Sequence, residues 1–134
     1  MRIAVFGTGA VGGYFGGRLA QAGEEVVFLA RGENLKALRE KGLRGESISG
    51  DFALNPVQAT DAPAEAGEVD AVLVCVKAWQ VEEAARSMQP MIGPETFVVP
   101  LQNGVEAPGL LANILGEEHV LGGLCGLYTY MVGP

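Results

Sequence analysis

A glycine-rich hexapeptide near the amino terminus has the spacing that binds phosphate groups. Residues 7–12 read GTGAVG, a G-x-G-x-x-G pattern that follows an apolar run and opens a helical pattern. In this arrangement Gly7 permits a tight turn, Gly9 lets the backbone approach a pyrophosphate, and Gly12 lets the helix pack closely on the strand. The free N–H groups and the positive dipole at the helix start then face the negative charge. The residues expected to bind a dinucleotide are Gly7, Thr8, Gly9, Ala10, Val11 and Gly12; a tight helix–sheet contact without a ligand is the alternative.

The residue after the second apolar run indicates which dinucleotide is bound. NAD-binding versions of the motif have an Asp or Glu there, about 20 residues after the loop, which bonds the ribose 2′-hydroxyl. This sequence has Ala30 and Arg31 instead. A guanidinium can hold a 2′-phosphate through paired charge-assisted hydrogen bonds, whereas a carboxylate would repel it. We therefore predict NADP(H) as the cofactor, with Arg31 as the main discriminator; a solvated surface arginine is the alternative.

Two further polar residues follow predicted buried strands. Lys77 comes directly after the apolar run of residues 70–76, and Asn103 follows that of residues 96–101. Ligands bind at the carboxyl ends of strands in open α/β sheets. A lysine ammonium there suits a carboxylate or a ribose hydroxyl, and an asparagine amide both donates and accepts. Both have structural alternatives, because Lys77 could solvate a strand end and Asn103 precedes a glycine in a common turn dipeptide.

These candidates depend on an alternation of apolar runs and helical patterns along the chain. The alternation predicts a Rossmann-type, doubly wound, mainly parallel α/β sheet in a single domain. Residues 43–60 break the pattern with Ser-Gly-Asp between two short runs, which predicts a hairpin or another β excursion. Strands are predicted over residues 2–6, 25–30, 70–76, 96–101 and 120–131, and helices over residues 10–22, 34–41, 81–88 and 106–115.

Length and charge limit the class of protein. The chain has 134 residues, which is room for one domain and excludes a complete two-domain dehydrogenase. Its net charge of −7 argues against a nucleic-acid binder, because phosphate backbones require a basic face. Residues 1–44 carry +3 and residues 45–134 carry −10. This split is compatible with one local anionic ligand and equally with ordinary surface variation.

Cysteine spacing and hydropathy indicate the compartment. Cys75 and Cys125 lie far apart, inside apolar runs and without a C-x-x-C pair, so we expect two reduced, buried strand residues. No apolar run approaches the roughly 20 residues of a membrane span. We therefore expect a cytoplasmic protein with no membrane association, and no metal site is predicted.

Several other residues receive structural interpretations. Trp79 is expected to pack at a helix start and Gln80 to cap it. His119 is the only histidine and has no clear carboxylate partner in the sequence, so it is interpreted as structural. Tyr128 and Tyr130 lack a lysine four positions on, which argues against a short-chain reductase that uses a Tyr/Lys pair.

Three segments together resemble the ketopantoate reductase (2-dehydropantoate 2-reductase) family. They are RIAVFGTGAVGGYFGGRLAQAGEEVVFLAR at residues 2–31, VCVKAWQV at residues 74–81 and LQNGVE at residues 101–106. The first segment fits many Rossmann dehydrogenases, whereas K-A-W-Q followed at its proper distance by Q-N-G is far more specific. The resemblance covers essentially the whole chain, but only the amino-terminal half of the family's protein.

The resemblance implies NADPH-dependent reduction of 2-dehydropantoate to (R)-pantoate, a step toward pantothenate and coenzyme A. It implies that residues 7–12 bind the pyrophosphate and that Arg31 binds the 2′-phosphate. It further implies that Lys77 lines the cleft near the nicotinamide and that Asn103 contacts both the cofactor ribose and the substrate. In the family, the proton-donating Lys and the substrate-binding Ser and Glu belong to a helical carboxyl-terminal domain, and Gly133-Pro134 falls where the crossover toward that domain begins.

We therefore expect residues 1–134 to form an NADP-binding Rossmann domain that is incomplete for catalysis alone. Such a domain would expose an apolar face, covered by the missing domain or by self-association. A stand-alone NADP-sensing module is the alternative, favoured by the missing catalytic residues and disfavoured by K-A-W-Q and Q-N-G. An S-adenosylmethionine-dependent methyltransferase is weakened by Arg31, because a carboxylate for the ribose hydroxyls is expected there.

Overall fold

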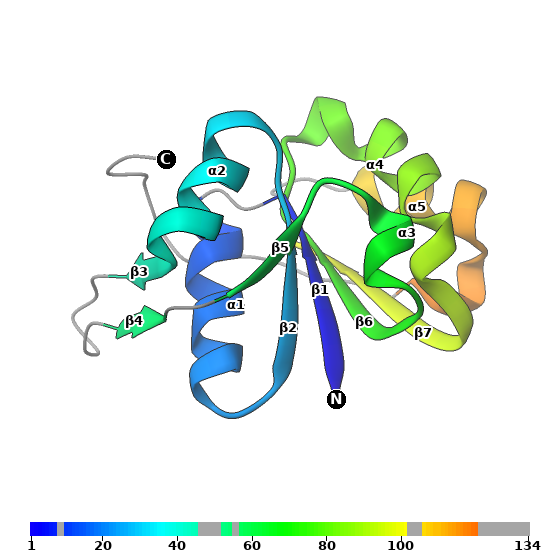
Figure 1. The fold of residues 1–134 in the computed structure, drawn as a ribbon. Coiled ribbons are helices and arrows are strands. Elements are labelled where there is room, and N and C mark those ends of the chain that lie inside the picture. Colours follow the sequence, from blue (N-terminus) through cyan, green and yellow to red (C-terminus); the bar gives the residue numbers. More distant parts are fainter. Residues whose placement is uncertain (8–9, 46–51, 55–56, 102–105, 121–134) are drawn as a thin grey trace.

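The main sheet contains five parallel strands in the order β5-β2-β1-β6-β7 (Figure 1). The computed structural model describes residues 1–7, 10–45, 52–54, 57–101 and 106–120. From β1 the chain proceeds outward to β2 and β5, and then returns to the other side of β1 for β6 and β7. This reversal places a topological switch point between β1 and β6 and confirms the doubly wound Rossmann-type sheet. The strands are β1 (Arg2–Phe6), β2 (Glu25–Leu29), β5 (Gln58–Thr60), β6 (Val69–Val74) and β7 (Ile92–Pro100).

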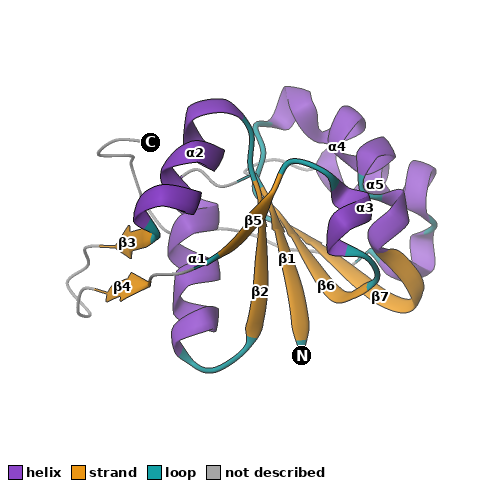
Figure 2. Ribbon diagram, viewed as in Figure 1, coloured by secondary structure: helices purple, strands orange, loops and turns teal. Residues whose placement is uncertain are grey.

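Helices cover both faces of this sheet (Figure 2). Ile3 and Val5 of β1 belong to the core under α1 and α2, whereas Ala4 belongs to the core under α3, α4 and α5. Because both faces are buried, the central strands are apolar at successive positions rather than at alternate ones. The helices are α1 (Ala10–Gln21), α2 (Gly32–Lys41), α3 (Pro63–Ala66), α4 (Val81–Ser87) and α5 (Glu106–Leu115).

The segment that breaks the alternation forms a small antiparallel pair, β3 (Leu43–Gly45) with β4 (Phe52–Leu54). This confirms the predicted β excursion. The next strand, β5, joins the edge of the main sheet beside β2, which the sequence pattern did not indicate. Three 3₁₀ turns were also not predicted: η1 (Ala78–Gln80), η2 (Gln89–Met91) and η3 (Glu117–His119).

Strand β7 begins four residues earlier than predicted, at Ile92, because it contains an irregularity. The register between β6 and β7 shifts between Val69 and Ala71. The hydroxyl of Thr96, which is 3% exposed, donates to the Val69 carbonyl and accepts from the Gly93 N–H at 2.8 Å. The Thr96 side chain therefore provides hydrogen bonds for the Gly93 N–H and the Val69 carbonyl, close to the point where the register between the two strands shifts.

Glycines in α1 let this helix lie close to the sheet. A Cβ on Gly16 would lie 2.5 Å from Cε1 of Phe28 and 2.9 Å from Cγ2 of Val5. Gly13 faces a different neighbour, because its Cβ would lie 3.6 Å from Cδ1 of Leu43, an ordinary contact distance. This helix therefore packs closely on the sheet at Gly16.

Some surface and edge expectations need correction. Cys75 lies one residue beyond β6 and is only partly buried, so it is not the buried strand residue predicted; Cys125 lies outside the described residues. Met1 and Trp79 are the large apolar side chains exposed in the described part of the chain, and the apolar face expected where the missing domain would pack stays a prediction. Of the strand predicted over residues 120–131, only Val120 is described, and it bridges to Val98 in parallel. Among the helices that can be described, none has the length and apolar composition to cross a membrane.

Candidate functional site

The carboxyl ends of the central strands bring together three of the predicted site residues. Gly7 follows β1 directly, Arg31 lies two residues beyond β2, and Lys77 lies three residues beyond β6. Because the strands are parallel, these positions share one edge of the sheet, and the switch point lies among them. The first turn of α1 holds Ala10, Val11 and Gly12, whereas Thr8, Gly9 and Asn103 lie outside the described residues.

The backbone around the turn after β1 has no room for a side chain on Gly7 or on Gly12. Gly7 has a φ of 94°, and a Cβ there would lie 2.7 Å from Cγ1 and 2.9 Å from the backbone nitrogen of Val76. A Cβ on Gly12 would lie 2.3 Å from the Gly7 carbonyl oxygen and 3.2 Å from Cβ of Cys75. The start of α1 therefore packs directly against the segment that follows β6. Only glycine permits both the left-handed turn and this close approach.

Arg31 lies at the junction of β2 and α2 with its side chain in solvent. Its backbone is extended, and α2 begins directly after it at Gly32, two residues earlier than predicted. The Arg31 side chain is 72% exposed, and its Nη1 lies 3.7 Å from Oε1 of Glu83, which is 71% exposed. Glu83 belongs to α4, which follows β6, so this ion pair joins segments on the two sides of β1. The guanidinium is therefore accessible to an anion from solvent.

Sequence reasoning did not identify Glu83 as a site residue. Its only sequence signal is its place as one of two consecutive glutamates in the first turn of the helix after K-A-W-Q. Acidic residues are common there because they complement the helix dipole. The signal therefore does not distinguish a site residue from a stabilising one.

Lys77 and Gln80 close a short turn after β6. The Gln80 side-chain carbonyl accepts a hydrogen bond from the Lys77 N–H at 3.0 Å. In return the Gln80 N–H donates to the Lys77 carbonyl at 2.8 Å. This reciprocal pair fixes the backbone of Lys77, whose side chain is exposed. At α4 itself Gln80 makes no side-chain cap hydrogen bond, so the capping role predicted for it at that helix is wrong. Trp79 in the same turn is 81% exposed, so the packing role predicted for it is wrong.

His119 is structural, as expected, and belongs to the η3 turn beside β7. Its Nδ1 lies 2.8 Å from the backbone oxygen of Thr96. Because a carbonyl oxygen only accepts, Nδ1 carries the proton and donates it there. The expectation that His119 lacks a carboxylate neighbour is wrong, since its Nε2 lies 3.7 Å from Oε1 of the adjacent Glu118.

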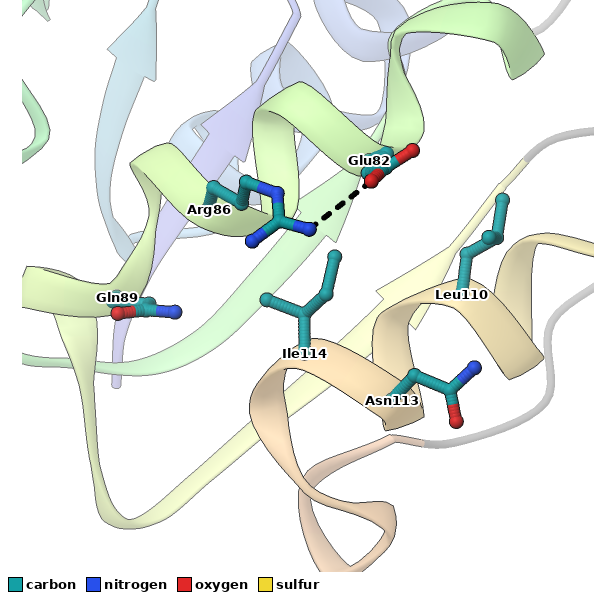
Figure 3. Close-up of a pocket in the computed structure, with 6 residues that line it drawn as sticks. All are labelled: Glu82, Arg86, Gln89, Leu110, Asn113 and Ile114. Carbon is teal, nitrogen blue, oxygen red and sulfur yellow. Dashed lines mark hydrogen bonds and ion pairs between the residues drawn. The ribbon is translucent and has the colours of Figure 1, made fainter.

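An open depression of about 410 Å³ lies between α4 and α5 (Figure 3). On its α4 side Glu82 and Arg86 form an ion pair at 3.1 Å, one helical turn apart. None of the predicted site residues that the structure describes lines it, so we locate the candidate site at the carboxyl edge of the sheet instead. The lining residues are Glu82, Arg86, Gln89, Leu110, Asn113 and Ile114.

Comparison with known sequences identifies relatives over nearly the whole chain. Residues 3–134 match the family described as ketopantoate reductase PanE/ApbA. The 2-dehydropantoate 2-reductase of Nostoc sp. PCC 7120 is 37% identical over 132 residues, which cover 98% of this chain and 41% of that protein. The uncharacterized oxidoreductase YkpB of Bacillus subtilis is 34% identical, covering 93% of this chain and 41% of its own length. The chain thus spans less than half the length of these relatives.

Solved structures agree with the sequence relatives. The 2-dehydropantoate 2-reductase of Porphyromonas gingivalis W83 is 40% identical with a TM-score of 0.84, covering 92% of this chain and 46% of that one. A D-mandelate dehydrogenase solved with NADH and anilino(oxo)acetate is 26% identical with a TM-score of 0.90, covering 100% of this chain and 44% of that one. With the family match extending from residue 3 to residue 134, the chain belongs to the ketopantoate reductase family.

Proposed function

We propose that residues 1–134 form the NADP-binding domain of a reductase that converts 2-dehydropantoate to (R)-pantoate. The observation that carries the proposal is the exposed guanidinium of Arg31, two residues beyond β2 on the same edge as the Gly7 turn. An NAD-binding domain would have a carboxylate near this position. Membership of the ketopantoate reductase family supports the reaction, and the D-mandelate dehydrogenase solved with NADH is a reason to test the choice of cofactor in this chain directly.

The residues at this edge fit a dinucleotide. Gly7 and Gly12 have no Cβ where one would collide, so the backbone turn is tight enough to approach a pyrophosphate. The start of α1 adds the positive end of a helix dipole. We assign the pyrophosphate to Gly7, Thr8, Gly9, Ala10, Val11 and Gly12, the 2′-phosphate to Arg31, the nicotinamide end to Lys77, and the ribose and substrate to Asn103.

The chain's own contribution to the reaction is binding and orientation. When bound, NADPH supplies the hydride that reduces a 2-keto group. Reduction also needs the substrate carbonyl held at reacting distance and a proton donor beside it. The exposed ammonium of Lys77, on a backbone fixed by Gln80, can hold a carboxylate or a ribose hydroxyl. We place the proton donor in the helical carboxyl-terminal domain that the family resemblance implies, which would be the partner of this domain.

Family membership makes the methyltransferase interpretation wrong. No feature of the described residues favours the sensing module. We also propose a cytoplasmic location, as expected from the cysteine spacing. The proposed substrate is a small 2-keto acid.

The proposal predicts that Arg31→Ala removes the preference for NADPH over NADH. We expect the Kd for NADPH to rise about tenfold, the lower end of the range for a hydrogen bond to a charged group, because the site is exposed. The Kd for NADH should change less than about twofold, since a 2′-hydroxyl makes no such charged contact. Isothermal titration calorimetry with both coenzymes measures the ratio.

The matched control is Arg39→Ala, which removes the same charge from α2. The Arg39 guanidinium lies 3.4 Å from the Ala59 carbonyl and is not directed at the glycine turn. The Arg39→Ala variant should bind NADPH and NADH with unchanged affinities. An unchanged NADPH to NADH ratio in Arg31→Ala would contradict the proposed cofactor.

A further inference from the structure

A carboxylate lies beside the cation to which we assign the 2′-phosphate. Oε1 of Glu83 is 3.7 Å from Nη1 of Arg31, and both side chains are more than two-thirds exposed. The preceding residue, Glu82, pairs instead with Arg86 on its own helix at 3.1 Å (Figure 3). Two adjacent glutamates of α4 therefore have different partners, and only Glu83 reaches across to the end of β2.

We propose that Glu83 is a specificity-determining residue that competes with a cofactor 2′-phosphate for Arg31. The inference rests on the proposed function, because it concerns the same cofactor site. A phosphate that binds Arg31 must displace the Glu83 carboxylate or remain close to it, and like charges at that distance repel. A neutral 2′-hydroxyl meets no such repulsion. Glu83 therefore weakens the binding of NADPH more than that of NADH. It reduces the preference for NADPH over NADH that Arg31 creates.

The opposite effect, in which Glu83 orders Arg31 for the phosphate, is the smaller of the two. An exposed ion pair at 3.7 Å restrains a solvated arginine weakly, because solvent screens the attraction and the side chains lose entropy in pairing. A phosphate carries up to two negative charges, so its repulsion by a nearby carboxylate is larger than that of a singly charged group. Removing the carboxylate should therefore improve NADPH binding.

The test compares Glu83→Gln with Glu82→Gln by calorimetric titration with NADPH and with NADH. Both changes remove one charge from the exposed face of the same helical turn, so neither should affect folding. We expect Glu83→Gln to lower the Kd for NADPH about three- to fivefold, the size of one exposed charge interaction, with the Kd for NADH unchanged. Glu82→Gln should change neither Kd. The gain should shrink at 0.5 M salt, because added ions screen exposed charges.

Three results would overturn the role of Glu83. They are an unchanged NADPH to NADH ratio in Glu83→Gln, weaker NADPH binding in that variant, and an equal gain in Glu82→Gln, which would reflect only the net charge of the protein. If the ratio responds to Arg31→Ala but not to Glu83→Gln, the role of Glu83 fails and the proposed function stands. If the unmodified chain binds neither coenzyme, both fail together.

Discussion

The glycines of this chain differ in what surrounds them. Alanine substitutions at two of them should therefore change the free energy of unfolding in opposite directions. Gly16→Ala would place a Cβ 2.5 Å from Cε1 of Phe28 and 2.9 Å from Cγ2 of Val5, both in the buried core. We expect it to lower the free energy of unfolding by about 1–3 kcal/mol through overpacking. Urea denaturation followed by circular dichroism measures this loss.

Gly109 in α5 is the matched control for the same substitution. A Cβ there meets no atom within 4 Å, and the backbone φ is not in the left-handed region. Gly109→Ala should therefore stabilise the protein by about 0.5–1 kcal/mol, because alanine loses less backbone entropy than glycine in a helix. Equal effects at the two positions would show that α1 does not pack on the sheet as closely as described.

Arginines in the cationic segment of residues 1–44 serve different purposes. Arg2 at the start of β1 donates from Nη2 to the Ala66 carbonyl at 2.7 Å and pairs with Glu25. It lies at the amino end of its strand, on the opposite edge of the sheet from Arg31. The charge excess of this segment therefore does not belong to a single anion site.

Residue identity and spacing were enough to locate the glycine turn, Arg31 and Lys77 on one edge. This is possible because each follows an apolar run directly, and parallel strands end on the same side. Glu83 could not be found in this way. Its interaction with Arg31 joins two elements that are distant in sequence, and only the folded sheet brings them within 3.7 Å.

At the scale of elements, the central strands were predictable and the edge features were not. Strands β1, β2 and β6 are buried on both faces, so their continuous apolar runs identify them. Strand β5 has three residues and pairs on one side only, so its sequence has no periodicity to detect. The early start of β7 was missed because the hydroxyl of Thr96 maintains the strand through an irregularity that apolar patterning does not record.

Thr96 should hold the irregular part of the β6–β7 pair in place. Thr96→Val keeps the shape of the side chain but removes the hydroxyl, which leaves the Gly93 N–H and the Val69 carbonyl without this partner. We expect a loss of about 2–6 kcal/mol in the free energy of unfolding, because each of the two buried polar groups left unsatisfied costs about 1–3 kcal/mol. Thr96→Ser retains the hydroxyl and should lose only about 1 kcal/mol, for one methyl group. Thermal and urea unfolding of both variants tests this, and a Val variant as stable as the Ser variant would contradict it.

At the scale of the whole molecule, the topology brings candidate residues that are distant in the sequence to the same edge of the sheet. The reversal of strand order at β1 places the turn after β1 between the segments that follow β2 and β6. Two apolar cores, one on each face, fix the sheet and therefore the relative positions of these segments. A site at this edge needs nothing beyond residues 1–134 to present Arg31, Gly7 and Lys77 together. The chain spans less than half the length of the relatives that it matches.

If this chain binds the cofactor and another domain donates the proton, residues 1–134 alone should bind NADPH without catalysing the reaction. In our proposal residues 1–134 supply the groups that bind and orient the dinucleotide, and the family resemblance implies that the proton donor belongs to a carboxyl-terminal domain. We expect saturable NADPH binding by calorimetry, whereas NADPH oxidation, followed by its absorbance, should be no faster with 2-dehydropantoate than without it. The reaction needs the substrate and a proton donor held against the nicotinamide, and cofactor binding alone does not lower that barrier. Robust turnover by this chain would mean that a proton donor lies within residues 1–134, and an Arg31→Ala variant should then lose that turnover at low NADPH concentration and recover it at high concentration.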